Sequence, residues 1–118
     1  MSEIEQNSIL KPGEKVHIIE KRFFKEDTRR HFVGEIVQCT ESNIRVRGYV
    51  WACEALKGFN KKPEIRERIF SLHEGLIINI VPPEVNLEEL KYVNILHKGL
   101  FVIDGKNFSL DITEFTIG

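Results

Sequence analysis

Four residues at alternate positions of one segment, Arg45, Arg47, Tyr49 and Trp51, have side chains suited to binding single-stranded nucleic acid. Guanidinium groups contact phosphates, and flat rings stack on bases. Alternate residues of an extended strand point to the same face, so these side chains are expected to share one surface. The predicted site for a ligand or partner extends onto the preceding segment and consists of Arg29, Arg30, His31, Arg45, Arg47, Tyr49 and Trp51.

The same residues also have a purely structural interpretation. In that interpretation Glu35 neutralises Arg47, and the two aromatic rings lie under a neighbouring strand or subunit. The charge distribution allows both interpretations, because residues 11–68 contain 14 Lys and Arg against 9 acidic residues, whereas the whole chain has a net charge of −1. Such asymmetry indicates either an anionic partner or attraction between basic and acidic parts of one fold or of neighbouring subunits.

Catalytic chemistry has little support in the sequence. The chain contains no G-x-S-x-G, G-x-x-x-x-G-K-[ST], G-x-G-x-x-G or H-E-x-x-H motif. His31 is expected near Glu35 and Trp51, where an imidazole can act as a general base or simply pack on the indole ring. The four histidines are far apart and none is close to a cysteine, so a zinc site is not predicted. We therefore expect no enzyme, no metal and no cofactor.

The predicted site depends on a hairpin over residues 29–53. Its arms are expected to join around residues 39–43, where Ser42 and Asn43 suit a turn. One register places apolar residues opposite apolar residues and an acidic residue opposite a basic one. Its predicted pairs are Gln38 and Ile44, Ile36 and Val46, Glu35 and Arg47, Gly34 and Gly48, Phe32 and Val50, and His31 and Trp51. Two opposed glycines leave room for a strongly coiled sheet or a close backbone approach, as in a small barrel.

The rest of the chain is also predicted to be mainly β. Period-two or continuous apolar patterns predict strands at 15–24, 65–72, 76–81, 95–97, 100–103 and 108–112. The strand at 76–81, LIINIV, is expected to be central and buried on both faces. Residues 55–62 are expected to form an irregular, mobile loop. Asn86 and Glu89 have capping-box spacing and predict one short helix near 86–92. The fold class expected is a small antiparallel β-barrel or sandwich of about seven strands.

Length and composition favour a single small β domain over residues 1–118, with residues 1–12 as a flexible N-terminal segment. No run of residues has the length and apolarity of a membrane span, and the N-terminal residues do not have the pattern of a secretion signal. We therefore expect a cytoplasmic protein. Cys39 and Cys53 do not form a disulfide framework and are expected to be small buried apolar residues.

Residues 31–51, about a sixth of the chain, resemble the central hairpin of Sm-type RNA-binding barrels. The resemblance rests on Gly34 early in one arm and Asn43 at the turn. It implies RNA binding, but Thr40 and Glu41 stand where that family usually has an aspartate, and its later glycine-containing motif is not recognisable. The R-x-x-x-R and D-x-S-x-x-G elements of cyclic-dinucleotide-binding PilZ barrels are both missing. The sequence is assigned to neither family.

Three functions remain open on the sequence. The main expectation is a non-catalytic protein-interaction or oligomerising β-barrel module, in which association buries Tyr49 and Trp51. The first alternative is a module that binds RNA, single-stranded DNA or another anionic ligand through the basic and aromatic strand face. The second alternative is a carrier of a small apolar ligand, with a cavity lined by Phe23, Phe32, Tyr49, Trp51 and Phe70.

Overall fold

The computed structural model describes residues 9–21, 29–54, 58–73 and 75–112. The chain divides into two compact units, Met1–Val81 and Pro82–Gly118, which are described separately. The single domain over residues 1–118 remains a prediction, and most of the predicted flexible segment, residues 1–8, lies outside the described part. No helix among the described residues is long and apolar enough to cross a membrane.

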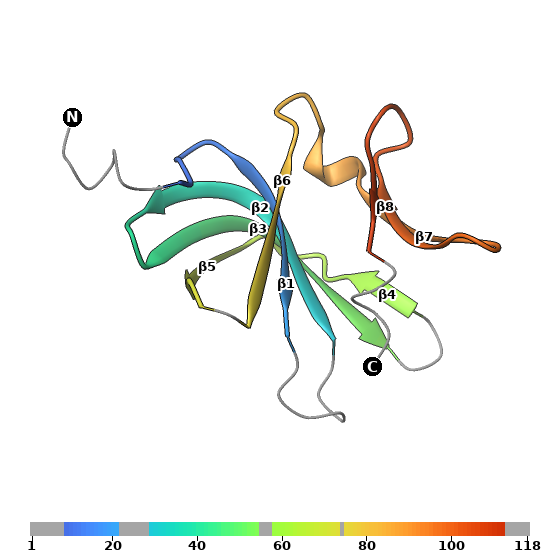
Figure 1. Cartoon of the computed structure of the whole chain (residues 1–118), viewed down its shortest axis with the longest axis horizontal. Helices are drawn as coiled ribbons and strands as arrows, with labels where there is room; N and C mark the ends of the chain where they lie inside the picture. Colours follow the sequence, from blue (N-terminus) through green and yellow to red (C-terminus); the bar gives the residue numbers. More distant parts are fainter. Residues whose placement is uncertain (1–8, 22–28, 55–57, 74, 113–118) are drawn as a thin grey trace. The chain divides into compact units, whose positions relative to one another are not determined.

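The first unit is one antiparallel sheet (Figure 1). Its strands are β1 (Lys15–Glu20), β2 (Arg30–Cys39), β3 (Asn43–Glu54), β4 (Gly58–Lys61), β5 (Arg66–Ser71) and β6 (Leu76–Val81). The order is β4-β3-β2-β1-β6, and β5 pairs with β3 on the same side as β4 does. β3 is long enough to pair with β5 through its first half and with β4 through its second half. The predicted loop at 55–62 is therefore wrong for 58–61, which form β4.

The predicted hairpin is present as β2 and β3, and most of its register is confirmed. The confirmed pairs are His31–Trp51, Phe32–Val50, Gly34–Gly48, Glu35–Arg47 and Ile36–Val46. The pairing of Gln38 with Ile44 is wrong, because the register shifts between Ile36 and Gln38, so Gln38 lies opposite Arg45 and Cys39 opposite Ile44. A bulge inserts one unpaired residue and bends the strand, and here that residue is Val37.

The opposed glycines allow a close backbone approach at the centre of the hairpin. A β-carbon on Gly34 would lie 2.5 Å from the Arg47 carbonyl oxygen, and one on Gly48 would overlap the Val33 carbonyl oxygen. No side chain larger than hydrogen fits at such distances. Both glycines are therefore needed for β2 and β3 to approach each other this closely.

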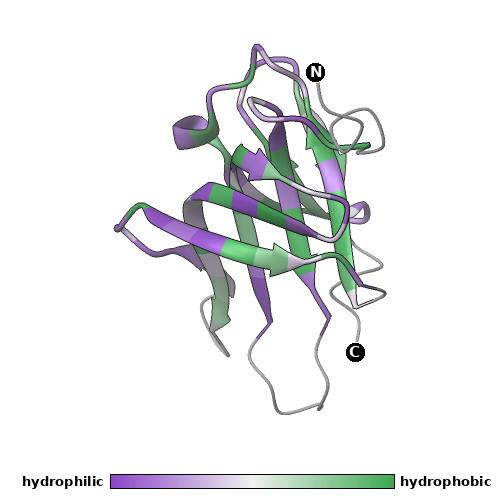
Figure 2. Ribbon diagram, turned by 90° about the vertical axis from the view of Figure 1, so that its left-hand side faces the viewer, coloured by the Kyte–Doolittle hydropathy of each residue, from purple (hydrophilic) through white to green (hydrophobic). Residues whose placement is uncertain are grey.

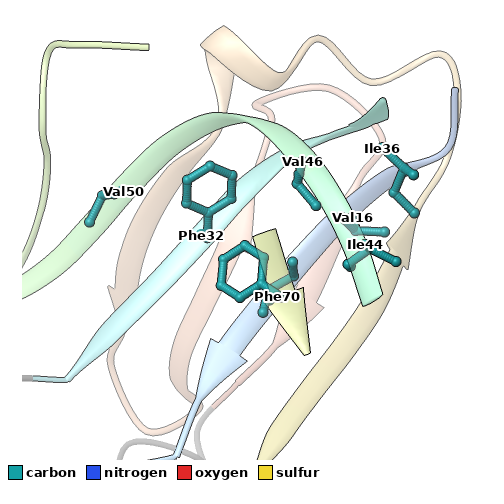
Figure 3. Close-up of a cluster of buried hydrophobic side chains, with 8 residues drawn as sticks. Val16, Phe32, Ile36, Ile44, Val46, Val50 and Phe70 are labelled. Atoms are coloured by element: carbon teal, nitrogen blue, oxygen red, sulfur yellow. The ribbon is translucent and has the colours of Figure 1, made fainter. Parts of the chain in front are cut away.

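One face of the sheet forms the main hydrophobic core of the first unit. Its side chains come from β1, β2, β3 and β5 and point toward one another (Figure 3), with Phe32 and Phe70 in edge contact at 5.4 Å between ring centroids. The buried members of this cluster are Val16, Ile18, Phe32, Ile36, Ile44, Val46, Val50 and Phe70. Hydrophobic and hydrophilic residues alternate along several strands (Figure 2), as expected when successive side chains point to opposite faces.

The second unit has a three-stranded antiparallel sheet of β7 (Lys91–Ile95), β8 (Gly99–Ile103) and β9 (Ser109–Asp111). Asp104 stabilises the turn after β8, because its Oδ1 accepts hydrogen bonds from the backbone N–H groups of Lys106 and Phe108 at 2.8 and 3.0 Å. The helix predicted near 86–92 is wrong in type and length. Asn86 does cap a turn, but that turn is the 3-10 segment Leu87–Glu89, and β7 begins at Lys91.

The mainly β, antiparallel class is confirmed, with nine strands in the described part of the chain instead of about seven. The expectation of a central β6 is wrong, since β6 is at the end of the strand order and pairs with β1 alone among the described strands. Closure of the first sheet into a barrel requires pairing between β5 and β6, and the described residues show none.

Candidate interaction surface

The predicted basic and aromatic face is divided between exposed and buried residues. Arg45 and Arg47 are exposed, whereas the Trp51 side chain is only 7% exposed and Tyr49 is half-buried. His31, predicted to lie at the surface, is 2% exposed and belongs to the interior. Arg30 is exposed and Arg29 half-buried. The seven predicted residues therefore do not form one continuous accessible surface.

The exposed arginines alternate with acidic residues. Arg47 lies between Glu35 on β2 and Glu67 on β5 in the strand register, and Arg45 Nε is 3.9 Å from Glu67 Oε1. The Tyr49 ring is covered by the Lys61 ammonium group, which lies 4.3 Å from the ring centroid. These contacts compensate positive charge locally and occupy one face of the ring on which a base would stack.

His31 takes part in a buried hydrogen-bonded chain that the sequence did not reveal. His17 on β1 is fully buried and lies directly opposite Asn79 of β6. Asn79 Nδ2 is 3.3 Å from His17 Nδ1, and His17 Nε2 is 3.2 Å from His31 Nδ1. The amide group of Asn79 donates to Nδ1 of His17, so His17 carries its proton on Nε2 and donates it to Nδ1 of His31. Both imidazoles are neutral in this arrangement.

The surroundings of the two histidines favour the neutral form of both. Burial lowers the pKa of His17 from 6.5 to about 4. Burial, followed by the charges of His17 and Arg29, lowers the pKa of His31 to about 3. The His31 ring also packs against Phe59 of β4, with 4.6 Å between ring centroids. The pair is therefore a satisfied polar element inside the protein that has no exposed imidazole to offer a substrate.

The histidine pair does not extend into a metal-binding cluster. Within the described residues, no group of three or more His, Cys, Asp or Glu side chains gathers around a common point. Zinc sites usually have three or four protein ligands. Cys39 and Cys53 are not joined in a disulfide and are half-buried, less buried than expected. The Cys39 thiol donates a hydrogen bond to the Leu10 carbonyl oxygen at 3.1 Å.

The cavity expected for an apolar ligand does not form from its predicted residues. Phe32 and Phe70 pack against each other in the core, whereas Tyr49 and Trp51 alternate with the core-facing Val50 of β3 and point to the opposite face. Phe23 lies outside the described residues. A hollow of about 100 Å³ does lie beside the β2–β3 turn, near Thr40, but it is smaller than ordinary ligand sites.

Three strands of the first unit have an edge with no partner among the described strands: β4, β5 and β6. β4 has only four residues, whereas β5 and β6 have six each and offer the two longer open edges. The backbone groups on these edges follow from the alternation of antiparallel hydrogen bonds. Lys21 N–H donates to Gly75 C=O at 2.8 Å, so residues 77, 79 and 81 point toward β1 and residues 76, 78 and 80 point outward. Leu72 N–H donates to Ser42 C=O at 2.8 Å, so residues 67, 69 and 71 point outward from β5.

The two open edges differ in chemistry. Three of the six residues of β5 are charged: Arg66, Glu67 and Arg68. Charged side chains on an edge strand discourage pairing with another chain. β6, with the sequence LIINIV, has no charge, and its Ile80 side chain is 53% exposed. β6 is the strand that natural proteins normally cover or protect, so it is the candidate interaction surface.

This surface was not predicted, although its signal was in the sequence. A run of five apolar residues and one Asn predicts a doubly buried central strand, because periodicity alone does not distinguish a central strand from an edge strand. In comparisons with known proteins, no family model, no curated sequence and no solved structure matches this chain.

Proposed function

We propose that this protein is a non-catalytic interaction module that self-associates by adding a second strand to the open edge of β6. The observation that carries the proposal is the uncharged β6 strand, which pairs only with β1 among the described strands and leaves Ile80 exposed. An added strand satisfies outward backbone N–H and C=O groups and covers apolar side chains at the same time.

Backbone hydrogen bonds and apolar burial both favour association along β6. Each backbone hydrogen bond gained contributes about 1 kcal/mol of net free energy. Covering the exposed half of the Ile80 side chain contributes on the order of 1 kcal/mol for each copy. Both contributions depend on the same six residues of β6, so a charge introduced there should remove them together.

Barrel closure is the competing use of the same edge. A barrel requires β5 and β6 to pair within one chain, and that pairing would occupy the backbone groups of Ile78 and Ile80. We propose instead that the sheet stays open at this position and is completed by a second copy. Binding of nucleic acid has weaker support, since Arg45 and Arg47 lie beside Glu67 and Tyr49 lies under Lys61. We propose a cytoplasmic location, where the thiols of Cys39 and Cys53, which form no disulfide, remain reduced.

The test is native mass spectrometry of the purified wild-type protein together with two matched variants. Ile80→Lys places a charge on the β6 edge, and Ile69→Lys places the same charge on the β5 edge, where the original side chain is 64% exposed. The wild type and Ile69→Lys should have the mass of an assembly, and Ile80→Lys the mass of one chain. A monomeric wild type contradicts the proposal, as does an assembly that survives Ile80→Lys.

The absorbance ratio at 260 and 280 nm of the same sample distinguishes the alternatives. Extra mass with nucleotide-like absorbance would support an anionic ligand, and Arg45 and Arg47 would then be the residues to replace. Extra mass without that absorbance would support a small organic ligand. An assembly with a mass that is a whole multiple of the chain mass supports the proposed self-association.

A further inference from the structure

We infer that self-association, which rests on the proposed function above, takes the form of a symmetric dimer in which β6 pairs antiparallel with β6 of a second copy. The two-fold axis passes beside Asn79, and Ile78 of each copy lies opposite Ile80 of the other. The six-stranded sheet of one copy then continues into the sheet of its partner.

The direction and register follow from the outward backbone groups of β6. Ile78 and Ile80 point away from β1, and neither has a backbone partner among the described strands. Leu76 also points outward, but its N–H already donates to the His73 carbonyl oxygen at 3.1 Å. Pro82 follows the strand and has no N–H to donate.

Only antiparallel pairing places identical strands together under two-fold symmetry. When Ile78 lies opposite Ile80 of the second copy, each of these residues exchanges both of its backbone hydrogen bonds with the other, as in a hydrogen-bonded antiparallel pair. The register therefore uses the backbone N–H and C=O groups of both Ile78 and Ile80 in each copy. The groups that it leaves aside are those of Leu76 and Pro82, at the ends of the strand.

The side chains fit the same pairing. Leu76 and Ile78 pack against the core cluster of the first unit, and Ile80 points to the same face of β6. In the dimer, Ile80 lies beside Ile78 of the second copy, so the apolar row continues from one core to the other. No charged residue lies within β6, so like charges do not oppose each other along the paired strands.

A dimer built from the two different open edges is less favourable. Pairing β5 with β6 of another copy places the charged residues Arg66, Glu67 and Arg68 along an apolar strand. It also leaves one β5 edge and one β6 edge open, so copies would continue to add unless a ring closes. Symmetric β6 pairing leaves open the charged β5 edges and the short edges of β4 in the combined sheet.

Cysteine scanning locates the symmetry axis. Residue 79 faces its own equivalent in a non-hydrogen-bonded pair, with Cα atoms about 4.5 Å apart, within the range that a disulfide spans. Residues 78 and 80 are offset from their own equivalents by two positions, roughly 8 Å, which is too far. Under mild oxidation, Asn79→Cys should form a dimer linked through residue 79, and Ile78→Cys and Ile80→Cys should not.

The oxidised wild type shows any background from Cys39 and Cys53, and peptide mapping identifies the linked residues. Because Asn79→Cys removes the hydrogen bond to His17, amide hydrogen exchange of the unmodified protein is measured as well. The amides of Ile78 and Ile80 should be protected, and the outward amides of Glu67, Ile69 and Ser71 should exchange rapidly.

Three results are decisive. A disulfide at residue 79 with protected β6 amides supports the symmetric dimer. An assembly with protected outward amides on both β5 and β6, or with self-linkage at residue 78 or 80, overturns the register while leaving the proposed self-association intact. A wild-type protein with the mass of a single chain removes both proposals.

Discussion

Mild acid should destabilise the protein through the buried pair of His17 and His31. Both rings are neutral in the folded protein, and the hydrogen bonds from Asn79 to His17 and from His17 to His31 require this. The unfolded chain has ordinary histidines with a pKa near 6.5, whereas the folded values are about 4 and about 3. As pH falls below 6.5, the unfolded state therefore gains protons that the folded state cannot bind.

The sign and size of the effect follow from this difference. Stability from the pair is fully present above pH 6.5 and decreases as pH falls, down to about 4 for His17 and about 3 for His31. Each proton contributes up to about 1.4 kcal/mol per pH unit, so two histidines give a slope of up to about 2.7 kcal/mol per pH unit. Over the full shifts the losses are on the order of 3 kcal/mol for His17 and 5 kcal/mol for His31. Their sum is comparable to the total stability of a small domain.

The assay is urea unfolding at a series of pH values between 7.5 and 5, followed by the fluorescence of Trp51, the single tryptophan of the chain, which is buried in the same unit. His17→Gln should reduce the slope of unfolding free energy against pH by about half, since one titrating group is lost. The exposed His97, at positive φ, provides a control as His97→Asn, because Asn tolerates that conformation. A flat profile between pH 6.5 and 5, or an unchanged slope in His17→Gln, would refute the reasoning.

Two further predictions concern the core and the hairpin. Phe70→Ala should lower the unfolding free energy by about 3 to 5 kcal/mol, because the ring is buried against Phe32. Ile69→Ala, at an exposed neighbouring position, should change the unfolding free energy by no more than about 0.5 kcal/mol. Equal effects of the two substitutions in denaturant titrations would show that β5 does not cover the core. Gly48→Ala should cost about 3 kcal/mol or more, since the added methyl overlaps the Val33 carbonyl group, and a variant that melts at the wild-type temperature would contradict the close approach of the two strands.

The hairpin could be predicted because several independent pairings agreed on one register. Opposite charges at Glu35 and Arg47, the facing glycines and the apolar pairs all required the same alignment. The bulge at Val37 could not be predicted, since Val37 is an apolar residue that the structure leaves exposed. The predicted register beyond Ile36 is therefore off by one residue, and Cys39 lies opposite Ile44 where Gln38 was expected.

The histidine pair and the open edge depend on contacts between distant segments. His17 and His31 meet because β1 pairs with β2, and Asn79 joins them because β6 pairs with β1. No local pattern around any of these residues predicts that pairing. The prediction of a short helix was wrong for a different reason. A cap such as Asn86 can stabilise either a single 3-10 turn or a longer helix, and here the chain enters β7 at Lys91 after one 3-10 turn.

The central claim is that the outer edge of β6 pairs with another copy of the chain. The most direct measurement is the exchange rate of the Ile80 amide hydrogen in the unmodified protein as the protein concentration is raised. Pairing predicts that this amide becomes steadily more protected as the assembly forms, while the outward amide of Ile69 on β5 does not change. Rapid exchange of the Ile80 amide at every concentration would contradict the claim.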